Sequence, residues 1–187
     1  MINHLRPALT LVVAMTALTG LAYPLAINGI AQAVLPAKAN GSVIERDGRV
    51  IGSALIGQNF ASDRYFWPRP SATGPDPYNA AASSGSNLGT TSVKLKDRVT
   101  ADVARLTETG IAQPVPADAV TTSGSGLDPH ISPAFAEAQV ARVAQARGLD
   151  PSAIAALVAQ QIENPDFGVI GQARVNVLEL NLALDAL

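Results

Sequence analysis

The chain has 187 residues, of which 48% are hydrophobic and only 15% are charged, and its formal net charge is −2. A slightly acidic chain is not expected to bind nucleic acid. The absence of cysteine excludes disulfides, thiolate zinc sites and thiol catalysis. About 150 residues remain after the apolar N-terminus, which is enough for one domain with its own core.

The segment between Arg6 and Lys38 contains no charged side chain. Because a helix needs roughly 20 apolar residues to cross a bilayer, this stretch predicts a transmembrane helix. The alternative is a signal peptide released after Ala39, where the sequence Ala-Lys-Ala resembles a cleavage site. The apolar part of a signal peptide is usually about 7–15 residues long, so the length of this stretch favours a retained span. The Tyr23–Pro24 pair predicts a kink or the approach to the outer interface.

Small residues and charge indicate how the span packs and how it is oriented. Ala14, Ala17 and Gly20 are spaced roughly one turn apart and suit the close approach of another helix, although small residues are common throughout this chain. Arg6 precedes the span without any acidic residue, and a short cationic N-terminus favours a cytoplasmic location. We therefore expect residues 1–6 in the cytoplasm. Residues 7–35 then form the transmembrane helix with an outer extension, and 36–187 form a single extracytoplasmic domain.

The first elements after the span are expected to be short strands. Residues 42–46 and 49–55 flank Asp47–Gly48, a strong two-residue hairpin signal. Residues 71–91 are rich in Pro, Gly, Ser, Asn and Ala and predict a long polar loop. Ordered loops of that length are usually functional or fixed by a partner. Residues 113–120 are interrupted by proline and predict an extended segment or an edge strand.

Three helices follow from apolar periodicity and from start and stop signals. They are expected at 92–107, at 133–147 with Ser132 as its N-cap, and from 151 to just before Asn164. The last segment, 175–187, fits either a strand or a helix, and its Leu and Ala content favours a helix capped by Asn176. The fold class is therefore α+β: one transmembrane helix, then a domain of short strands and about four helices with long loops.

The run from Ser123 to Pro133 contains the residue types of two catalytic motifs. Its Ser-Gly-Ser-Gly segment resembles a phosphate loop but lacks the Lys-Ser/Thr pair of a nucleotide-hydrolysing one. Ser125, Asp128 and His130 have the chemistry of a hydrolase triad, but triad groups usually converge from distant positions. The alternative is a tight turn that Asp128 caps before a helix. An exported or membrane-anchored hydrolase using Ser125 and His130 therefore remains a rival hypothesis, and no metal site is expected.

The aromatic segment Tyr65-Phe66-Trp67 holds three of the few aromatic residues and the only tryptophan. With Arg64 and Arg69 beside it, this segment is typical of interface anchors. It is equally consistent with the core of a domain that has few aromatic residues.

Several ordered motifs are familiar together. They are L-R-P-A-L-T, A-L-I-G-Q-N-F, Y-F-W-P-R-P-S-A, Y-N-A-A-A-S-S-G-S-N-L-G, T-S-G-S-G-L-D-P-H-I-S-P and V-N-V-L-E-L-N-L-A-L-D. Over essentially its whole length the chain resembles the KdpC family, the small C subunit of bacterial Kdp high-affinity potassium-transporting ATPases. The most specific motif is S-G-S-G-L-D-P-H-I-S-P. Pro68 stands where a small residue such as Gly is expected.

The resemblance implies a non-catalytic accessory subunit of an ATP-driven potassium uptake complex. The protein is then a single-pass protein of the bacterial inner membrane, with its N-terminus inside and its domain outside. Its implied partners are a channel-like potassium-binding A subunit, a P-type B subunit that hydrolyses ATP, a small F subunit and the lipid bilayer. The complex uses ATP and potassium, and no cofactor is expected on this chain. A role in ATP binding is attributed to the family, and for an extracytoplasmic domain such an effect must be indirect.

The resemblance also suggests which loops meet the partners. Residues 65–72, 78–89 and 123–133 are expected to contact the channel-like subunit. The expected contact residues are Tyr65, Phe66, Trp67, Arg69, Asn79, Asn87, Ser125, Asp128 and His130.

Overall fold

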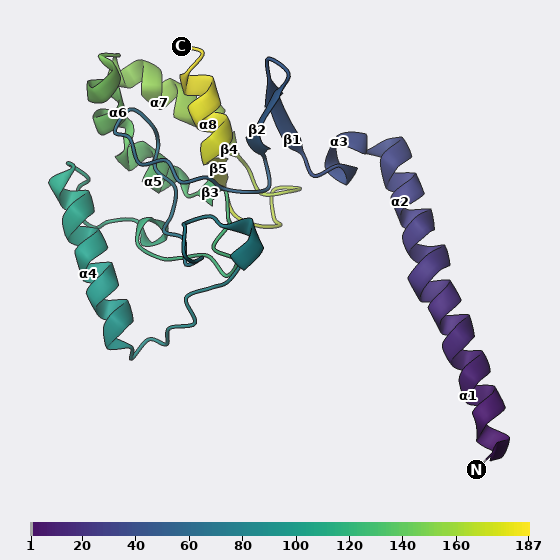
Figure 1. The fold of residues 1–187 in the computed structure, drawn as a ribbon. Coiled ribbons are helices and arrows are strands. Elements are labelled where there is room, and N and C mark those ends of the chain that lie inside the picture. Colours follow the sequence, from purple (N-terminus) through teal and green to yellow (C-terminus); the bar gives the residue numbers. More distant parts are fainter. Residues whose placement is uncertain (1) are drawn as a thin grey trace. The chain divides into compact units, whose positions relative to one another are not determined.

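The structure is a computed structural model that describes residues 2–187 (Figure 1). Internal contacts divide the chain into two compact units, Met1–Ile51 and Gly52–Leu187.

The first unit begins with one continuous helical run. It consists of α1 (Ile2–Met15), the π-helical segment η1 (Thr16–Ala22) and α2 (Tyr23–Val34). Its Asn3–Val34 part, 32 residues, is long and apolar enough to cross a membrane, and none of its most apolar stretch is buried against the rest of the structure. At about 1.5 Å per residue it is roughly 48 Å long, which exceeds the hydrocarbon core of about 30 Å. The helix is therefore a candidate span with residues to spare at its ends.

The π-helical segment accompanies Pro24. The Tyr23 N–H donates to the Leu18 carbonyl, five residues back, and Pro24 has no N–H to donate. The irregularity expected at the Tyr23–Pro24 pair therefore takes the form of a π-helical stretch just before the proline. Beyond α2 the chain continues through α3 (Pro36–Ala39) into strands β1 (Val43–Arg46) and β2 (Arg49–Ser53).

The expected hairpin is confirmed, because β1 and β2 pair directly. Both turn residues adopt positive φ, 53° at Asp47 and 73° at Gly48, as a two-residue hairpin turn of this kind requires. The second strand ends at Ser53, two residues earlier than expected. Its Oγ accepts a hydrogen bond from the Leu55 N–H at 3.1 Å, and this turn ends the extended conformation.

The second unit mixes short strands with helices, so the expected α+β fold class is confirmed. Its elements are η2 (Ala80–Ala82), α4 (Val93–Glu108), η3 (Ala117–Ala119), β3 (His130–Ile131), α5 (Pro133–Ala138), α6 (Val140–Arg147), α7 (Pro151–Gln160), β4 (Ile162–Glu163), β5 (Arg174–Asn176) and α8 (Val177–Leu184). The expected caps are present: the Ser132 hydroxyl accepts from the Phe135 N–H, and the Asn176 side chain accepts from the first turn of α8.

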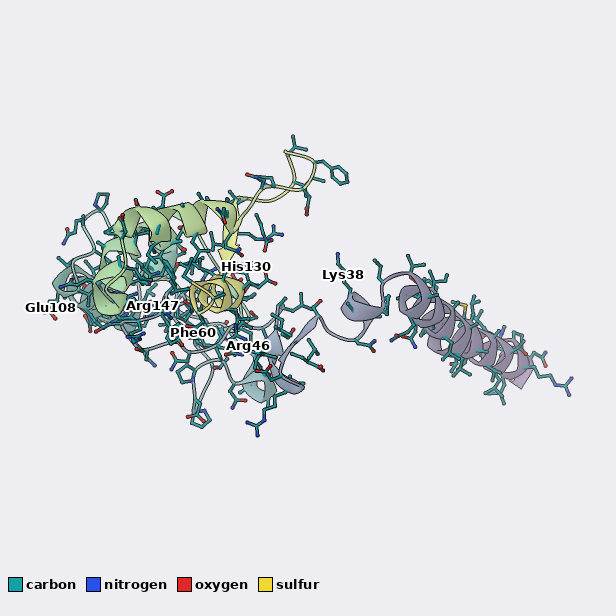
Figure 2. The ribbon with its side chains drawn as sticks, turned by 90° about the horizontal axis from the view of Figure 1, so that it is seen from above. Lys38, Arg46, Phe60, Glu108, His130 and Arg147 are labelled. Atoms are coloured by element: carbon teal, nitrogen blue, oxygen red, sulfur yellow. The ribbon has the colours of Figure 1, made fainter. Side chains whose placement is uncertain are left out.

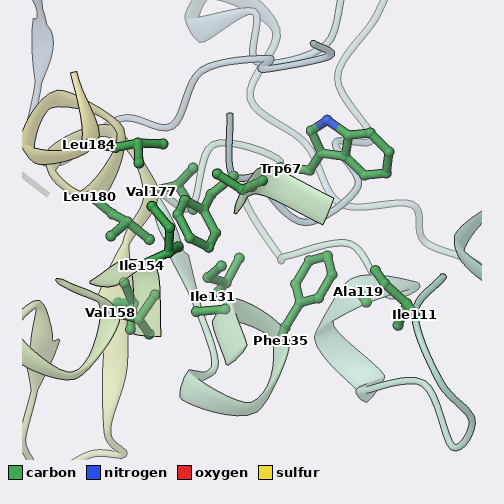
Figure 3. Packing of buried hydrophobic residues seen from close by; sticks show 14 of the residues in the cluster. Trp67, Ile111, Ala119, Ile131, Phe135, Ile154, Val158, Val177, Leu180 and Leu184 are labelled. Carbon is green, nitrogen blue, oxygen red and sulfur yellow. The ribbon is translucent and has the colours of Figure 1, made fainter. Parts of the chain in front are cut away.

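Strand β5 is the centre of a small antiparallel sheet with the order β3-β5-β4. Val175 pairs with Ile131 on one side and with Ile162 on the other. The helices α5, α7 and α8 contact this sheet or one another, and the apolar core lies among them (Figure 3). Fully buried core side chains include Phe66, Leu106, Ile111, Phe135, Val143, Ile154, Val158, Val175, Leu180 and Leu184.

Three expectations about elements were wrong. Residues 113–120 form no strand, and their second half is the short 3-10 helix η3 instead. The helix expected over 133–147 is divided at Gln139 into α5 and α6. Gln139 is 0% exposed, and its side-chain amide binds the backbone of another segment, so tertiary contacts fix the residue at which the helix changes direction.

The third correction concerns the helix expected from 151 to just before Asn164. Helix α7 stops at Gln160 because the next residues leave it to form β4. The helix expected in 175–187 is confirmed as α8 with Asn176 as its cap, and the residues just before it form β5. Strands of two or three residues are too short to show a period of alternation in the sequence.

Candidate functional site

The aromatic segment lies in the core, and two buried amides hold its backbone. Asn181 accepts from the Phe66 N–H at 2.8 Å and donates to the Phe66 carbonyl at 3.0 Å. Gln139 accepts from the Trp67 N–H at 2.7 Å and donates to the Trp67 carbonyl at 3.2 Å. Phe66 is 0% exposed and Trp67 is 9% exposed. Both rings are therefore part of the core, and partner contact stays a prediction for them.

Arginines from α4 and α6 flank the Trp67 ring. The Arg142 guanidinium lies 3.6 Å from the ring centroid, and that of Arg105 lies 5.4 Å away. Arg142 also donates to the carbonyls of Asp63 and Tyr65 and to the Gln139 amide oxygen. Burial lowers the pKa of Arg142 to about 10, although the Asp63 carboxylate opposes this shift. The guanidinium is therefore still charged at neutral pH.

Tyr65 is half-buried and attaches the same segment to the C-terminus. Its hydroxyl donates to the Asp185 carboxylate at 3.1 Å, and the Arg147 guanidinium lies over its ring at 4.9 Å. Arg147 in turn pairs with Asp185 at 2.6 Å. The segment 65–67 is thus bound to α6 and to the end of α8.

Charged side chains around Asp128 form a continuous network. Arg69 pairs with Asp128 at 2.8 Å. The other Asp128 oxygen accepts from the His130 N–H at 3.0 Å and lies 3.2 Å from His130 Nδ1. His130 Nε2 faces Glu163 at 3.9 Å, and Glu163 pairs with Arg174 at 2.8 Å. The network therefore connects the loop before β3 to strands β4 and β5.

The pKa of Asp128 reflects these contacts. Partial burial acts to raise it, but the hydrogen bonds from His130 and the Arg69 guanidinium outweigh burial and hold the pKa at about 2. Asp128 is therefore ionised at neutral pH. Burial, together with the neighbouring Asp128 carboxylate, raises the pKa of the Tyr78 hydroxyl far above its usual range.

A cavity of about 470 Å³ opens beside this network, and its lining also includes Asp118, Ser132 and Gln172. Asp118 accepts from the Ser132 N–H at 2.6 Å and from its hydroxyl at 2.8 Å. Each carboxylate and guanidinium of the lining thus has a partner within the chain. Among residues 2–187, no group of three His, Asp or Glu side chains is placed to hold a metal ion.

The expected long loop, 71–91, is fixed to the Ser123–Pro133 run by hydrogen bonds. The Ser71 hydroxyl donates to the Gly126 carbonyl at 2.7 Å, and the Ser84 N–H donates to the Ser125 carbonyl at 3.0 Å. Gly126 has a φ of +69°, and a Cβ there would lie 2.8 Å from the Thr73 methyl group and 2.9 Å from the Ser84 carbonyl. Only glycine allows this approach between the two loops.

The remaining loop residues hold local turns or are exposed. Asn79 caps η2 by accepting from the Ala81 N–H at 3.0 Å. Asn87 is exposed and has a φ of 51°, a left-handed conformation that asparagine tolerates. The exposed Ser125 accepts from the Leu127 N–H at 3.1 Å.

The hydrolase triad is not assembled. In such a triad the second ring nitrogen of the histidine faces the nucleophile, whereas His130 Nε2 faces Glu163. No hydrogen bond joins Ser125 to His130 in the part of the chain that the structure describes. Asp128 instead caps a turn by accepting from the His130 N–H, as the alternative interpretation of this run predicted.

In the N-terminal unit, the spacing of Ala14, Ala17 and Gly20 crosses from α1 into η1. A π-helical turn holds more residues than an α-helical one, so a three-residue spacing does not keep a constant face through this segment.

Sequence reasoning missed Gln139, Asn181, Glu163 and Arg174. The two amides are polar residues within apolar helical segments, and each is at most 2% exposed. A polar residue on the apolar face of a helix is the sequence signal that could have indicated a buried hydrogen-bonding role for these two amides. Glu163 and Arg174 gave no signal, because only the register of β4 and β5 brings them together.

Comparison with known proteins gives one consistent result. Residues 5–186 match the family model KdpC, described as K⁺-transporting ATPase, c chain. A protein of Allorhizobium ampelinum is 60% identical, with 100% of this chain and 97% of the relative covered. Relatives from Methylorubrum populi and Polaromonas naphthalenivorans are 57% and 58% identical, with at least 95% of each relative covered. All three are named potassium-transporting ATPase KdpC subunit.

Proposed function

The chain belongs to the KdpC family of K⁺-transporting ATPase c chains, and on this premise we propose that it assembles or stabilises an ATP-driven potassium uptake complex. It is an accessory subunit and not the catalytic one. Its proposed partners are a channel-like potassium-binding A subunit and a P-type B subunit that hydrolyses ATP. A small F subunit is a further proposed partner.

The accessory role is best supported by the contacts of the polar loop residues. Arg69, Asp128 and His130 contact one another, and His130 also faces Glu163. Ser125 accepts from the Leu127 N–H of its own turn, and its carbonyl accepts from the Ser84 N–H of the loop 78–89. These contacts fix three long loops as a surface of defined shape, as a docking surface requires. The hydrolase alternative is not supported.

Within this proposal the N-terminus is cytoplasmic and residues 36–187 lie outside the inner membrane. Residues 7–35, which include most of the helix Asn3–Val34, cross the bilayer. Ala14, Ala17 and Gly20 are proposed to let partner helices approach, from more than one side of the helix. Any effect on ATP binding reaches the B subunit indirectly, through the membrane helices.

The contact surface is proposed to lie on the loops 65–72, 78–89 and 123–133. Its exposed positions include Asn87 and Ser125. Five partly buried residues are proposed both to hold this surface and to meet a partner: Tyr65, Arg69, Asn79, Asp128 and His130. Phe66 and Trp67 support it from the core.

The test is recovery of the complex in mild detergent. The chain is expressed with its A and B subunits, and affinity purification of the A subunit shows whether this chain is retained. Replacing residues 1–35 by a cleaved export signal should abolish recovery, because the anchor and its helix contacts are lost. The matched control is a span of scrambled order and identical composition, which keeps the anchor and tests the packing. Normal assembly and potassium transport without any span would contradict the proposal.

A further inference from the structure

The connection between β4 and β5 carries three apolar side chains that are exposed to solvent. We refer to residues 164–173 as the apolar finger. Phe167 is 93% exposed, Val169 is 82% exposed and Ile170 is 59% exposed. Figure 2 shows this connection, in yellow-green, projecting as a narrow loop from the helices of its unit. Single exposed apolar residues are ordinary, but three large ones within four residues at a loop tip are typical of an interaction site.

The tip of the finger has a defined conformation. The Asp166 and Ile170 backbones exchange two hydrogen bonds of 2.9 Å, and the Gly168 N–H donates to the Pro165 carbonyl at 2.9 Å. Phe167 has a φ of 55°, a left-handed conformation that is unfavourable for a bulky residue. A glycine or an asparagine would adopt this backbone with less strain. An exposed phenylalanine held there contributes little to its own fold, which indicates that the ring serves another contact.

The charges around the finger disfavour an anionic lipid surface as that contact. Asp166 is an exposed acid at the tip itself. Arg174 is the one basic residue between 161 and 174, and it pairs with Glu163 at 2.8 Å. Loops and helices that bind anionic membranes place free Lys or Arg beside their apolar residues. Between residues 161 and 174, all of which the structure describes, no unpaired cation accompanies Phe167, Val169 and Ile170.

A second copy of the chain is also disfavoured as the occupant. A convex finger that enters a pocket elsewhere on an identical chain forms a heterologous contact. Such contacts close only when the rotation between copies forms a ring, and otherwise produce open filaments. A subunit of a complex already has different partners at hand, so no self-association is needed to bury the finger.

We propose that the apolar finger inserts into an apolar crevice on another protein subunit of the same membrane complex. Phe167 fills the crevice, Val169 and Ile170 line its mouth, and a basic or N–H-donating rim faces Asp166. This inference rests on the proposed function, because it requires that the complex forms. It adds a contact outside the three loops proposed above.

Photo-cross-linking identifies the occupant directly. The full chain is expressed with its partner subunits and carries p-benzoylphenylalanine at position 167, with the same residue at Val93 as a control. Val93 is 70% exposed on a different element, α4. Irradiated membranes should give an adduct with one partner subunit from position 167 and none from position 93. An adduct with lipid, an adduct with a second copy, or no adduct from position 167 would each overturn the proposal.

Substitution separates binding from folding. Phe167→Asn suits the left-handed backbone, so the melting temperature of the purified chain should stay the same or rise. Retention in the complex should nevertheless fall by about tenfold to a hundredfold, as for loss of one buried aromatic anchor. Phe167→Leu should retain most binding, and Val93→Asn should have no effect. Equal retention of Phe167→Asn and wild type would overturn the inference. Failure of the wild-type chain to recover any partner would instead overturn the proposed function.

Discussion

At the scale of single residues, polar side chains take the place of backbone partners in this fold. Gln139 and Asn181 each pair with both the N–H and the carbonyl of one residue, at Trp67 and Phe66. The backbone of Phe66 and Trp67 is therefore hydrogen-bonded as fully as that of a strand in a sheet, although these two residues belong to no strand. Leaving such buried groups without partners costs about 1–3 kcal/mol each. The exposed loops depend on this buried framework for their positions.

The Asp128 network should make stability depend on pH in acid. Because the folded pKa is about 2 and the unfolded value is about 3.9, the contribution of Asp128 is present above about pH 4. It is lost as the pH falls through about 2, and it amounts to about 2 kcal/mol. Denaturant unfolding of the detergent-solubilised chain should show Asp128→Asn less stable than wild type at pH 6. The gap should close as the pH approaches about 2.

The control for this pH dependence is Asp76→Asn, which removes one exposed acid from the same unit. Its unfolding free energy at pH 6 should match that of the wild type. A gap between wild type and Asp128→Asn that stays constant from pH 6 into acid would show that the Asp128 carboxylate is not stabilised by its partners.

At the scale of elements, the sequence was most informative where local signals decide the structure. The hairpin at Asp47–Gly48 and the helices capped by Ser132 and Asn176 follow from turn chemistry and capping. The sheet could not be predicted, because β3 and β4 have only two residues each and exist through pairing with β5. The break at Gln139 was missed for a similar reason, since its amide binds a segment 72 residues away.

In the candidate site, too, local contacts could be predicted from the sequence and long-range contacts could not. Proximity in sequence was enough to place Asp128 beside His130, and capping chemistry correctly favoured a turn there. The Arg69 partner lies 59 residues away, and Glu163 approaches His130 only through the pairing of β4 with β5. Burial of Phe66 and Trp67 depends on the packing of the whole unit, which their residue types alone do not determine.

Two glycines of the Ser-Gly-Ser-Gly run provide a test of how the loops are joined. Gly126→Ala should destabilise the chain by about 2–4 kcal/mol, because it adds a left-handed alanine and a clash with Thr73 and the Ser84 carbonyl. Gly124→Ala should change stability by less than about 0.5 kcal/mol, since a Cβ there meets no atom within 4 Å. Thermal unfolding of both purified variants measures the difference. Equal stability of the two variants would mean that the loops are not in this contact.

At the scale of the whole molecule, the two units differ in how their apolar side chains are covered. The helix Asn3–Val34, a candidate membrane span, has no buried residue in its most apolar stretch. The unit Gly52–Leu187 has its own apolar core. A chain built in this way suits a folded domain that is attached to a membrane complex by one helix. Which side of the membrane holds the domain then determines which partner surfaces it can reach.

Cysteine labelling tests this orientation cleanly, because the natural chain contains no cysteine. Asn3→Cys lies before the apolar run, and Ala104→Cys lies on an exposed position of α4. On intact spheroplasts, a membrane-impermeant maleimide should label Ala104→Cys, and it should label Asn3→Cys only after permeabilisation. The short cationic N-terminus is the physical reason for this expectation. Labelling of Asn3→Cys from outside would reverse the orientation, and an intact mass that lacks the residues up to Ala39 would show a cleaved signal peptide instead of a span.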